Sequence, residues 1–236
     1  MMTLLPGETF LTTADFKQRN QRQHDLVPPE RLAACNAIVI GVGAIGRQVA
    51  LQLAAIGIHC MALYDPDQVK LENLATQGFW ESDVGSTKVN AVAKQARQQF
   101  PKLELHTFAE RFRKSHVQKW STSRQIAVFC CVDSMDTRKL IWEAIQPKSH
   151  FFVDGRMAAE VIRVLASDTP TLDEHYSKTL FASAEAYAGE CTAKSTIYTA
   201  NIAAGLMIGQ FTRWLRRIPV VHEQVFNLLA QELIAS

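Results

Sequence analysis

A glycine-rich segment behind an apolar run constrains this chain more than any other feature. Gly41-Val42-Gly43-Ala44-Ile45-Gly46 directly follows the apolar residues 37–40, and a second apolar run at 60–64 leads into Asp65, nineteen positions after Gly46. A strand, a tight glycine turn, a helix, a second strand and an acid in this order are typical of a nucleotide site. Phosphates bind at the helix N-terminus in such sites, and the acid contacts the ribose.

Composition excludes several classes of protein. The chain has 236 residues, of which 47% are hydrophobic and 20% charged, as expected for a globular protein with a substantial core. Its formal net charge of +2 is too small to indicate binding to nucleic acid or to an anionic membrane. The five cysteines form no Cys-x-x-Cys pair, which argues for reduced thiols. Because we find neither a signal-peptide pattern nor a membrane-length apolar run, we expect a cytoplasmic protein.

Apolar runs and helical patterns alternate through the first two thirds of the chain. We expect strands at 37–41, 58–64, 103–107, 126–132 and 150–154, and helices at 44–56, 87–99, 114–121 and 135–146. This alternation predicts an α/β fold with a doubly wound, Rossmann-like and mostly parallel sheet. The connection at 65–86 is expected to be irregular.

The pattern changes after residue 155. An antiparallel strand is expected at 159–166, a loop-rich stretch at 167–194, and two C-terminal helices at 196–216 and 222–234. The polar residues 1–30 are expected to form an N-terminal arm, with a short helix within 14–24. Residues 31–236 are then a single nucleotide-binding domain.

The stretch after the second expected strand carries a more specific pattern. Asp65-Pro66-Asp67-Gln68-Val69 is followed by Asn73-Leu74-Ala75-Thr76-Gln77 and by Gly85-Ser86-Thr87-Lys88. This series is similar to the Asp-x-Asp-x-Val, Asn-Leu-x-Arg-Gln and Gly-x-x-Lys signature of the ubiquitin-activating-enzyme-like adenylyltransferases (ThiF/MoeB/HesA type). That family includes the thiamine-biosynthesis and molybdopterin-synthase activating enzymes.

Three other segments add to the resemblance, which covers most of residues 19–217. They are Arg19-Asn20-Gln21-Arg22-Gln23, Val132-Asp133-Ser134-Met135-Asp136-Thr137-Arg138 and Glu190-Cys191-Thr192-Ala193. They resemble the family's N-terminal arm, its strand-end aspartate and the segment with its reactive cysteine. The block from 41 to 88 is the most specific part.

The resemblance implies roles for individual residues. It places the loop of Gly41, Gly43, Ala44 and Gly46 at the nucleotide, together with Asp65 on the ribose hydroxyls and Asp67 nearby. It also puts Asn73 and Lys88 at the phosphates, Asp133 on Mg²⁺, and Arg22 at a phosphate in the partner subunit of a dimer. Taken alone, Lys88 would be interpreted as a solvated helix lysine.

Thr76 stands where the family has an arginine. Arginines in phosphoryl transfer are worth about 10³–10⁵ in rate, and threonine cannot supply their charge. Either another arginine replaces it, with Arg47, Arg138 and Arg156 as candidates, or the chain binds nucleotide poorly and acts as a scaffold or as half of a heterodimer. Asp154-Gly155-Arg156 ends the last parallel strand at the ligand edge, where a structural salt bridge is the alternative role for Arg156.

We predict no structural zinc of the family's kind, because two Cys-x-x-Cys pairs are missing. The seven histidines show no ligand spacing and are interpreted as surface or core residues. Cys130 and Cys131 are expected in the core. Cys191 has two open interpretations: a nucleophile for thioester or persulfide chemistry, or a small side chain near a helix start.

Three functions compete. The first is an ATP- and Mg²⁺-dependent adenylyltransferase that activates the C-terminal carboxylate of a small ubiquitin-like protein or peptide, with thioester or sulfur transfer to follow if Cys191 is a nucleophile. For this function we expect residues 155–236 to recognise the carrier and to pack in a homodimer or heterodimer. The second is a non-catalytic partner subunit that binds a ubiquitin-like protein. The third is an NAD-dependent oxidoreductase, which leaves Asn73, Lys88 and Asp133 unexplained.

Overall fold

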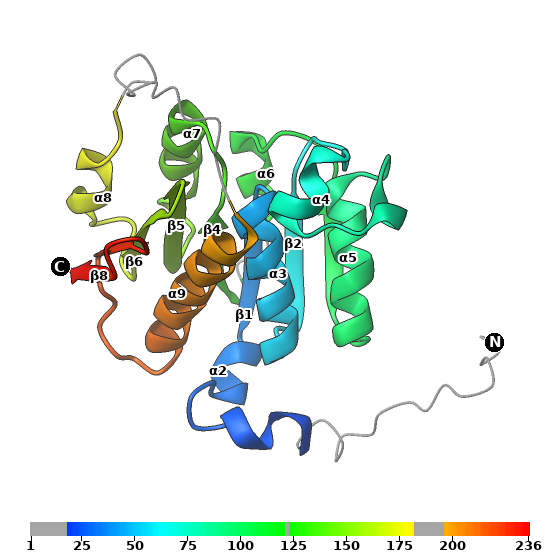
Figure 1. Ribbon diagram of the computed structural model, residues 1–236. Coiled ribbons are helices and arrows are strands. Elements are labelled where there is room, and N and C mark those ends of the chain that lie inside the picture. Colours follow the sequence, from blue (N-terminus) through cyan, green and yellow to red (C-terminus); the bar gives the residue numbers. More distant parts are fainter. Residues whose placement is uncertain (1–17, 121–122, 182–195) are drawn as a thin grey trace.

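The fold alternates strands and helices, as the sequence predicts. The computed structural model describes residues 18–120, 123–181 and 196–236 (Figure 1). Its strands are β1 Cys35–Ile40, β2 Cys60–Tyr64, β3 Glu104–Phe108, β4 Gln125–Cys130, β5 Phe151–Ala158, β6 Val161–Ser167, β7 Glu223–Asn227 and β8 Glu232–Ala235. Its helices are the 3₁₀ turns η1 Gln21–Gln23 and η2 Glu81–Asp83, and α2 Pro29–Ala33, α3 Ala44–Ile56, α4 Glu72–Gln77, α5 Lys88–Gln99, α6 Lys114–Gln118, α7 Met135–Ile145, α8 Glu174–Lys178 and α9 Ile197–Leu215.

All the strands join one sheet in the order β3-β2-β1-β4-β5-β6-β7-β8. Pairing is parallel from β3 to β5 and antiparallel from β5 to β8. The chain moves outward from β1 to β3 and then returns to the other side of β1 with β4. The carboxyl ends of β1 and β4 therefore flank a topological switch point, where ligands bind in open α/β sheets.

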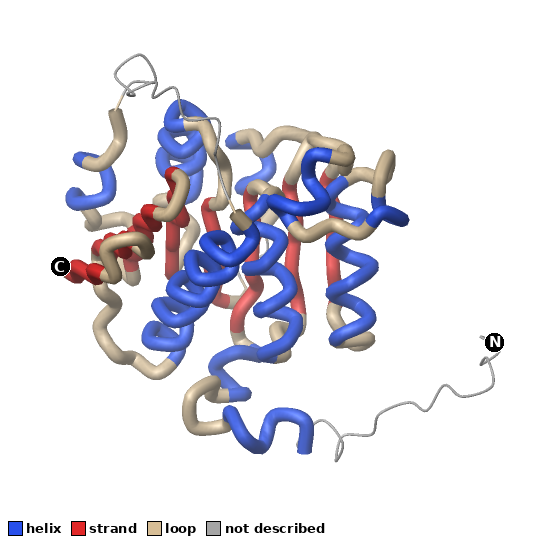
Figure 2. The backbone as a smooth tube through the Cα atoms, viewed as in Figure 1, coloured by secondary structure: helices blue, strands red, loops and turns tan. Residues whose placement is uncertain are grey.

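Alternation along β1 builds a hydrophobic core on each face of the sheet. Cys35, Ala37 and Val39 face the layer of α3, α5 and α9, whereas Ile38 and Ile40 face the layer of α6, α7 and α8. Because both faces are covered at this strand, its residues are nearly all apolar. Figure 2 shows α3 and α9 crossing the near face of the sheet side by side.

The expected helix at 222–234 is wrong, because this segment is the hairpin of β7 and β8. Asn227 turns the chain: its side-chain oxygen accepts hydrogen bonds from the backbone N–H groups of Leu229 and Ala230, both at 3.1 Å. The open edge of β6 then supplies β7 with a hydrogen-bonding partner that no local pattern reveals. The connection at 65–86 is also more regular than expected, since it contains α4 and η2.

The described part of the N-terminal arm is fastened to the C-terminus of α3. Arg19 donates to the carbonyls of Ala54 and Ala55 at 3.0 and 2.9 Å, and the Gln23 amide donates to the Ile56 carbonyl at 3.0 Å. These donors bind carbonyls of the last helical turn, of which Ala54 also accepts from the Gly57 N–H at 3.1 Å. The arginine carries the charge that the negative end of a helix dipole favours.

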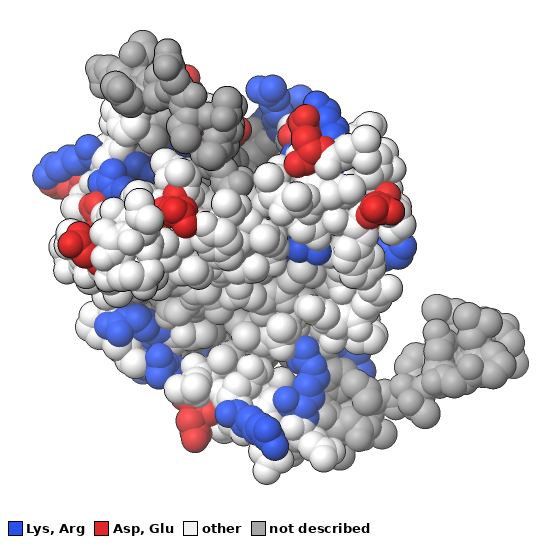
Figure 3. Space-filling model, in the orientation of Figure 1, with Lys and Arg blue, Asp and Glu red and all other residues white. Residues whose placement is uncertain are grey.

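Among the residues that the structure describes, no helix combines the length and the apolar character needed to cross a membrane. On the face drawn in Figure 3, uncharged surface covers much of α3 and α9, and the charged side chains of both signs are scattered around it. The mild net charge is thus not gathered into a basic stripe on this face.

Two helical glycines predict opposite effects of the same substitution. A Cβ at Gly46 would overlap the carbonyl oxygen of Gly41, whereas a Cβ at Gly205 in α9 would meet nothing within 4 Å. We expect Gly46→Ala to lower the free energy of unfolding by at least about 1–3 kcal/mol through overpacking. We expect Gly205→Ala to raise it by about 0.5–1 kcal/mol through helix propensity. Urea unfolding measures both, and equal effects would contradict the close approach at Gly46.

Candidate functional site

The glycine loop sets the N-terminus of α3 directly over the end of β1. Gly41 has a φ of 85°, and a Cβ there would lie 2.7 Å from the Cys131 carbonyl oxygen. Helix α3 begins without a side-chain cap and without an acidic residue in its first turn. Its first N–H groups are therefore available to an anion, which the helix dipole also favours.

Asp65 holds this loop in place from the end of β2. Its buried carboxylate accepts hydrogen bonds from the backbone N–H of Val42 at 2.8 Å and of Asp67 at 2.9 Å. Burial raises the pKa of Asp65, although these hydrogen bonds and Lys88 oppose the shift. Lys88, at the start of α5, is itself buried and donates to Asp67 at 3.0 Å. These three side chains line one cleft at the carboxyl ends of the parallel strands.

The opposite wall of the cleft contains a buried network of charges. Asp154 is fully buried and accepts from Arg138 Nε at 3.0 Å and from Arg156 Nε at 2.6 Å. The Tyr176 hydroxyl donates to the same carboxylate at 3.1 Å. Burial alone lowers the pKa of Arg138, but Asp154 raises it overall, so the guanidinium stays charged. Two arginines and one aspartate leave this wall with one net positive charge.

Asp133 lies between these groups, just beyond the end of β4. Its side chain is exposed, it lines the cleft, and its backbone carbonyl accepts a hydrogen bond from Arg138 Nη1 at 3.0 Å. Carboxylate oxygen is the ligand type that Mg²⁺ prefers. Cys131, expected in the core, instead lies past the strand end, is half-buried and lines the cleft, whereas Cys130 is buried as expected.

Several predicted residues point elsewhere. Asn73 is buried and its side-chain oxygen accepts from the Lys70 N–H at 2.9 Å, and it is not among the residues that line the cleft. Arg47 also turns away from the cleft and donates to Gln95 Oε1 at 2.7 Å. Arg22 lies exposed on η1, by the far end of α3. Cys191 lies outside the described residues.

Sequence reasoning gave no role to several polar residues of the cleft, among them Gln77 and Arg111. Gln77, at the end of α4, keeps a buried side-chain oxygen for which the described residues provide no hydrogen-bond partner. Arg111 is exposed on the loop between β3 and α6 and lines the cleft. Its only sequence signal is its place shortly after a strand of the parallel sheet. Thr76 does not line the cleft, and its hydroxyl donates to the Glu72 carbonyl at 3.1 Å.

The resulting cleft fits a nucleotide. It encloses about 1230 Å³ at the carboxyl ends of the parallel strands. A bare helix N-terminus, a buried lysine and a basic wall can hold a polyphosphate, and Asp133 can hold the Mg²⁺ that accompanies it. The unpartnered oxygen of Gln77 offers a further acceptor to a bound molecule.

Comparisons with known proteins show what the chain is similar to. The sequence profile of the ThiF family matches residues 18–232. The chain is 34% identical over 99 residues to the adenylyltransferase and sulfurtransferase MOCS3 of Oryza sativa subsp. japonica, a match that covers 39% of this chain and 22% of the relative. It is 30% identical over 113 residues to the sulfur carrier protein ThiS adenylyltransferase of Escherichia coli K12, covering 48% of this chain and 45% of the relative.

The fold is also that of a solved structure. The crystal structure of PaaA superposes with a TM-score of 0.76 at 20% identity, covering 99% of this chain and 77% of that one. At this identity the likeness concerns the fold alone. The matches cover less than half the length of the two curated relatives named above.

The charge network predicts a large loss of stability. Asp154→Ala leaves two buried guanidiniums without their anion, so we expect the free energy of unfolding to fall by about 3–5 kcal/mol. Tyr176→Phe removes one hydrogen bond to the same carboxylate and should cost only about 1 kcal/mol. Urea unfolding of both variants tests the ranking, and equal losses would show that the arginines find other partners.

Proposed function

The chain belongs to the ThiF family, and on that premise we propose that it is an ATP-dependent adenylyltransferase. Its substrate would be the C-terminal carboxylate of a small ubiquitin-like protein or peptide. The observation that carries the proposal is the cleft itself, which brings the uncapped N-terminus of α3, the buried Lys88 and the exposed Asp133 around one space.

The proposed reaction joins two anions. A carboxylate oxygen attacks the α-phosphorus of ATP, a new O–P bond forms, and the bond to the bridging oxygen breaks so that pyrophosphate leaves with that electron pair. The enzyme must hold both anions together and neutralise the charge on the leaving group. When bound, Mg²⁺ supplies part of that neutralisation, and Asp133 is the residue that would hold it.

Residues of the chain supply the rest. The α3 N–H groups and Lys88 would bind phosphate oxygens, and Asp65 would orient the ribose while it fixes the loop. The Lys88 ammonium group donates to Asp67 at 3.0 Å, and both side chains line the cleft. The pair is ready before any nucleotide binds, and less side-chain freedom is then lost on binding.

Arg111 is our candidate for the charge that Thr76 does not provide. Arg138 and Arg156 also line the cleft, but both are bound to Asp154, and Arg47 points away from it. Arg111 is exposed at the rim, and its guanidinium can reach an anion without breaking a buried ion pair. This assignment would resolve the choice between a replacement arginine and a site that binds nucleotide poorly.

Membership of the ThiF family guides our proposal for the binding partners of this chain. One relative is named for a sulfur carrier protein, which supports a small carrier as the substrate of this chain. We propose that the part after residue 155 binds the carrier and packs in a homodimer or a heterodimer, in which Arg22 serves the other subunit's cleft. Cys191 would then attack the acyl adenylate as a thiolate, so that a thioester forms and AMP leaves, or it would take part in sulfur transfer.

A non-catalytic partner subunit is the second candidate function, and Thr76 is the observation that favours it. Such a subunit would bind a carrier without forming the adenylate. No feature of the cleft favours an NAD-dependent oxidoreductase over these two, and membership of the family weighs against it.

Loss of the metal ligand should abolish the reaction. We expect Asp133→Ala to lower carrier-dependent exchange of labelled pyrophosphate into ATP at least about a hundredfold, because metal charge stabilisation is worth several kcal/mol. Asp168→Ala is the matched control, since Asp168 also follows a strand of the sheet but does not line the cleft. Unchanged exchange in Asp133→Ala would remove Asp133 from the metal role. Carrier binding without exchange in the unmodified chain would favour the non-catalytic subunit.

The arginine assignment predicts a binding defect. We expect Arg111→Ala to weaken the binding of Mg²⁺-ATP at least about tenfold, roughly 1.4 kcal/mol, because a charged hydrogen bond to phosphate is lost. Arg113→Ala is the control, as Arg113 is also exposed two residues later but does not line the cleft. Titration calorimetry gives both dissociation constants. Equal constants for the two variants would return the role to Arg138 or Arg156.

A further inference from the structure

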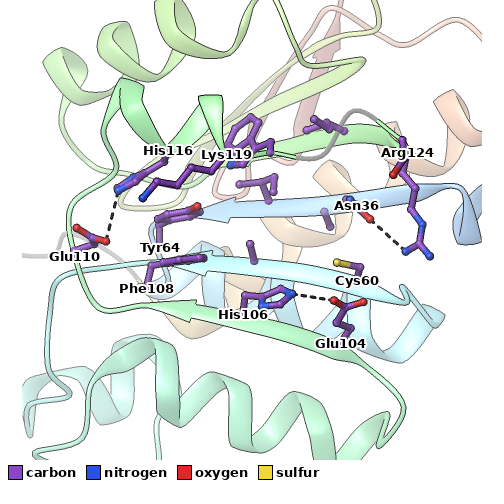
Figure 4. A pocket seen from close by; sticks show the side chains of 16 residues that line it. Asn36, Cys60, Tyr64, Glu104, His106, Phe108, Glu110, His116, Lys119 and Arg124 are labelled. Carbon is purple, nitrogen blue, oxygen red and sulfur yellow. Dashed lines mark hydrogen bonds and ion pairs between the residues drawn. The ribbon is translucent and has the colours of Figure 1, made fainter.

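A second cavity lies on the other face of the sheet. The strands β1, β2 and β3 form its floor, and α6 with the residues around it forms one wall. The cavity encloses about 490 Å³, and its lining combines aromatic rings with titratable side chains (Figure 4). The α3 and α5 layer covers the opposite face of these strands, so the cavity opens away from it.

Three potential metal ligands converge at one end of this cavity. Cys60 and Glu104 begin β2 and β3 and lie directly opposite each other in the parallel register. His106 is two residues further along β3, so the pleat brings its side chain to the same face as that of Glu104. One ligand atom from each of the three lies within 4.8 Å of the others, and His106 Nε2 is 3.1 Å from Glu104 Oε1.

We propose that Cys60, Glu104 and His106 form a Zn²⁺ site whose fourth position opens into the cavity. Sulfur, imidazole nitrogen and carboxylate oxygen are the three donor types that zinc accepts in tetrahedral sites. Three protein ligands with one open position is the arrangement of zinc sites that bind water or a small ligand, rather than of closed structural sites. The cavity beside it leaves room for that fourth ligand.

The donor set selects the metal. Thiolate is a poor ligand for Mg²⁺ and Ca²⁺, which prefer oxygen, and zinc stands high in the affinity order of divalent metals. The site is therefore chemically distinct from the one at Asp133. It is also distant from it, because Cys60 and Asp65 stand at opposite ends of β2, about 16 Å apart at 3.3 Å per residue.

The surroundings are compatible with a cation. Burial raises the pKa of Cys60, Glu104 raises it further, and Arg124 opposes the shift, so the free thiol holds its proton. Zn²⁺ would replace that proton, and its two positive charges would balance the thiolate and Glu104. Side chains of Glu104 and His106 are 63% and 53% exposed, which leaves the site open to solvent.

This site departs from the sequence-based view that the histidines are ordinary surface or core residues. Glu104-x-His106 is only a two-residue spacing, and Cys60 precedes it by more than forty positions. Only the register between β2 and β3 brings the three together. It is also unrelated to the four-cysteine site that the sequence is not expected to form.

Cobalt titration of the full chain, stripped of metal, tests the proposal. We expect one Co²⁺ per chain, with a thiolate-to-cobalt charge-transfer band and the visible absorption of a tetrahedral site, which stoichiometric Zn²⁺ abolishes and excess Mg²⁺ does not. Cys60→Ser should remove the charge-transfer band. His106→Ala should weaken zinc binding at least about tenfold, as loss of a direct ligand costs no less than loss of a supporting partner.

A matched control separates this site from surface binding. His24 is also exposed and lies 3.5 Å from a carboxylate, that of Asp25, so His24→Ala should leave the band and the zinc affinity unchanged. Circular dichroism checks that the variants are folded. If Cys60→Ser does not fold, His106→Ala decides the matter. A band that survives Cys60→Ser, or zinc affinity unchanged by His106→Ala, would overturn the proposal.

Discussion

Close backbone approach between Gly41 and Gly46 is the constraint on which the site depends. Neither position leaves room for a Cβ, because Gly41 lies against the Cys131 carbonyl and Gly46 against Gly41 itself. The chain can therefore leave β1 and enter α3 within three residues, and the helix axis points at the switch point of the sheet. The Asp65 carboxylate then fixes the loop by binding the Val42 N–H. The uncapped helix end and the buried acid therefore meet at the cleft because of this one turn.

The charges of the cleft are paired before substrate arrives. Lys88 binds Asp67, and Arg138 and Arg156 share Asp154, so the buried cations are held in place rather than left to solvent. Charges fixed in this way need little rearrangement when an anion enters, which is the basis of electrostatic preorganisation. The fully buried Asp154 is conspicuous here, since it turns two arginines into one rigid wall with a net positive charge.

The sequence predicted the parallel half of the fold well, because β1, β2, β4 and β5 are largely buried and read as apolar runs. It failed at 222–234, where the free edge of β6 turned an ambiguous apolar pattern into a hairpin. Asp65, Lys88 and Asp133 were predicted from the resemblance to a family signature, and all three line the cleft. Arg111 and the Asp154–Tyr176 contact were missed, since they depend on where a loop and a short helix lie in space. No spacing rule could have joined Cys60 to His106.

The described part of the arm contacts the C-terminal end of α3, the helix whose N-terminus faces the cleft. Arg19 and Gln23 hold three carbonyls at one end of α3, while the other end faces the cleft about 20 Å away at 1.5 Å per residue. Lifting the arm would remove these donors and a cation that matches the dipole of the helix. Contacts made by the arm therefore act on the same helix whose N-terminus faces the cleft.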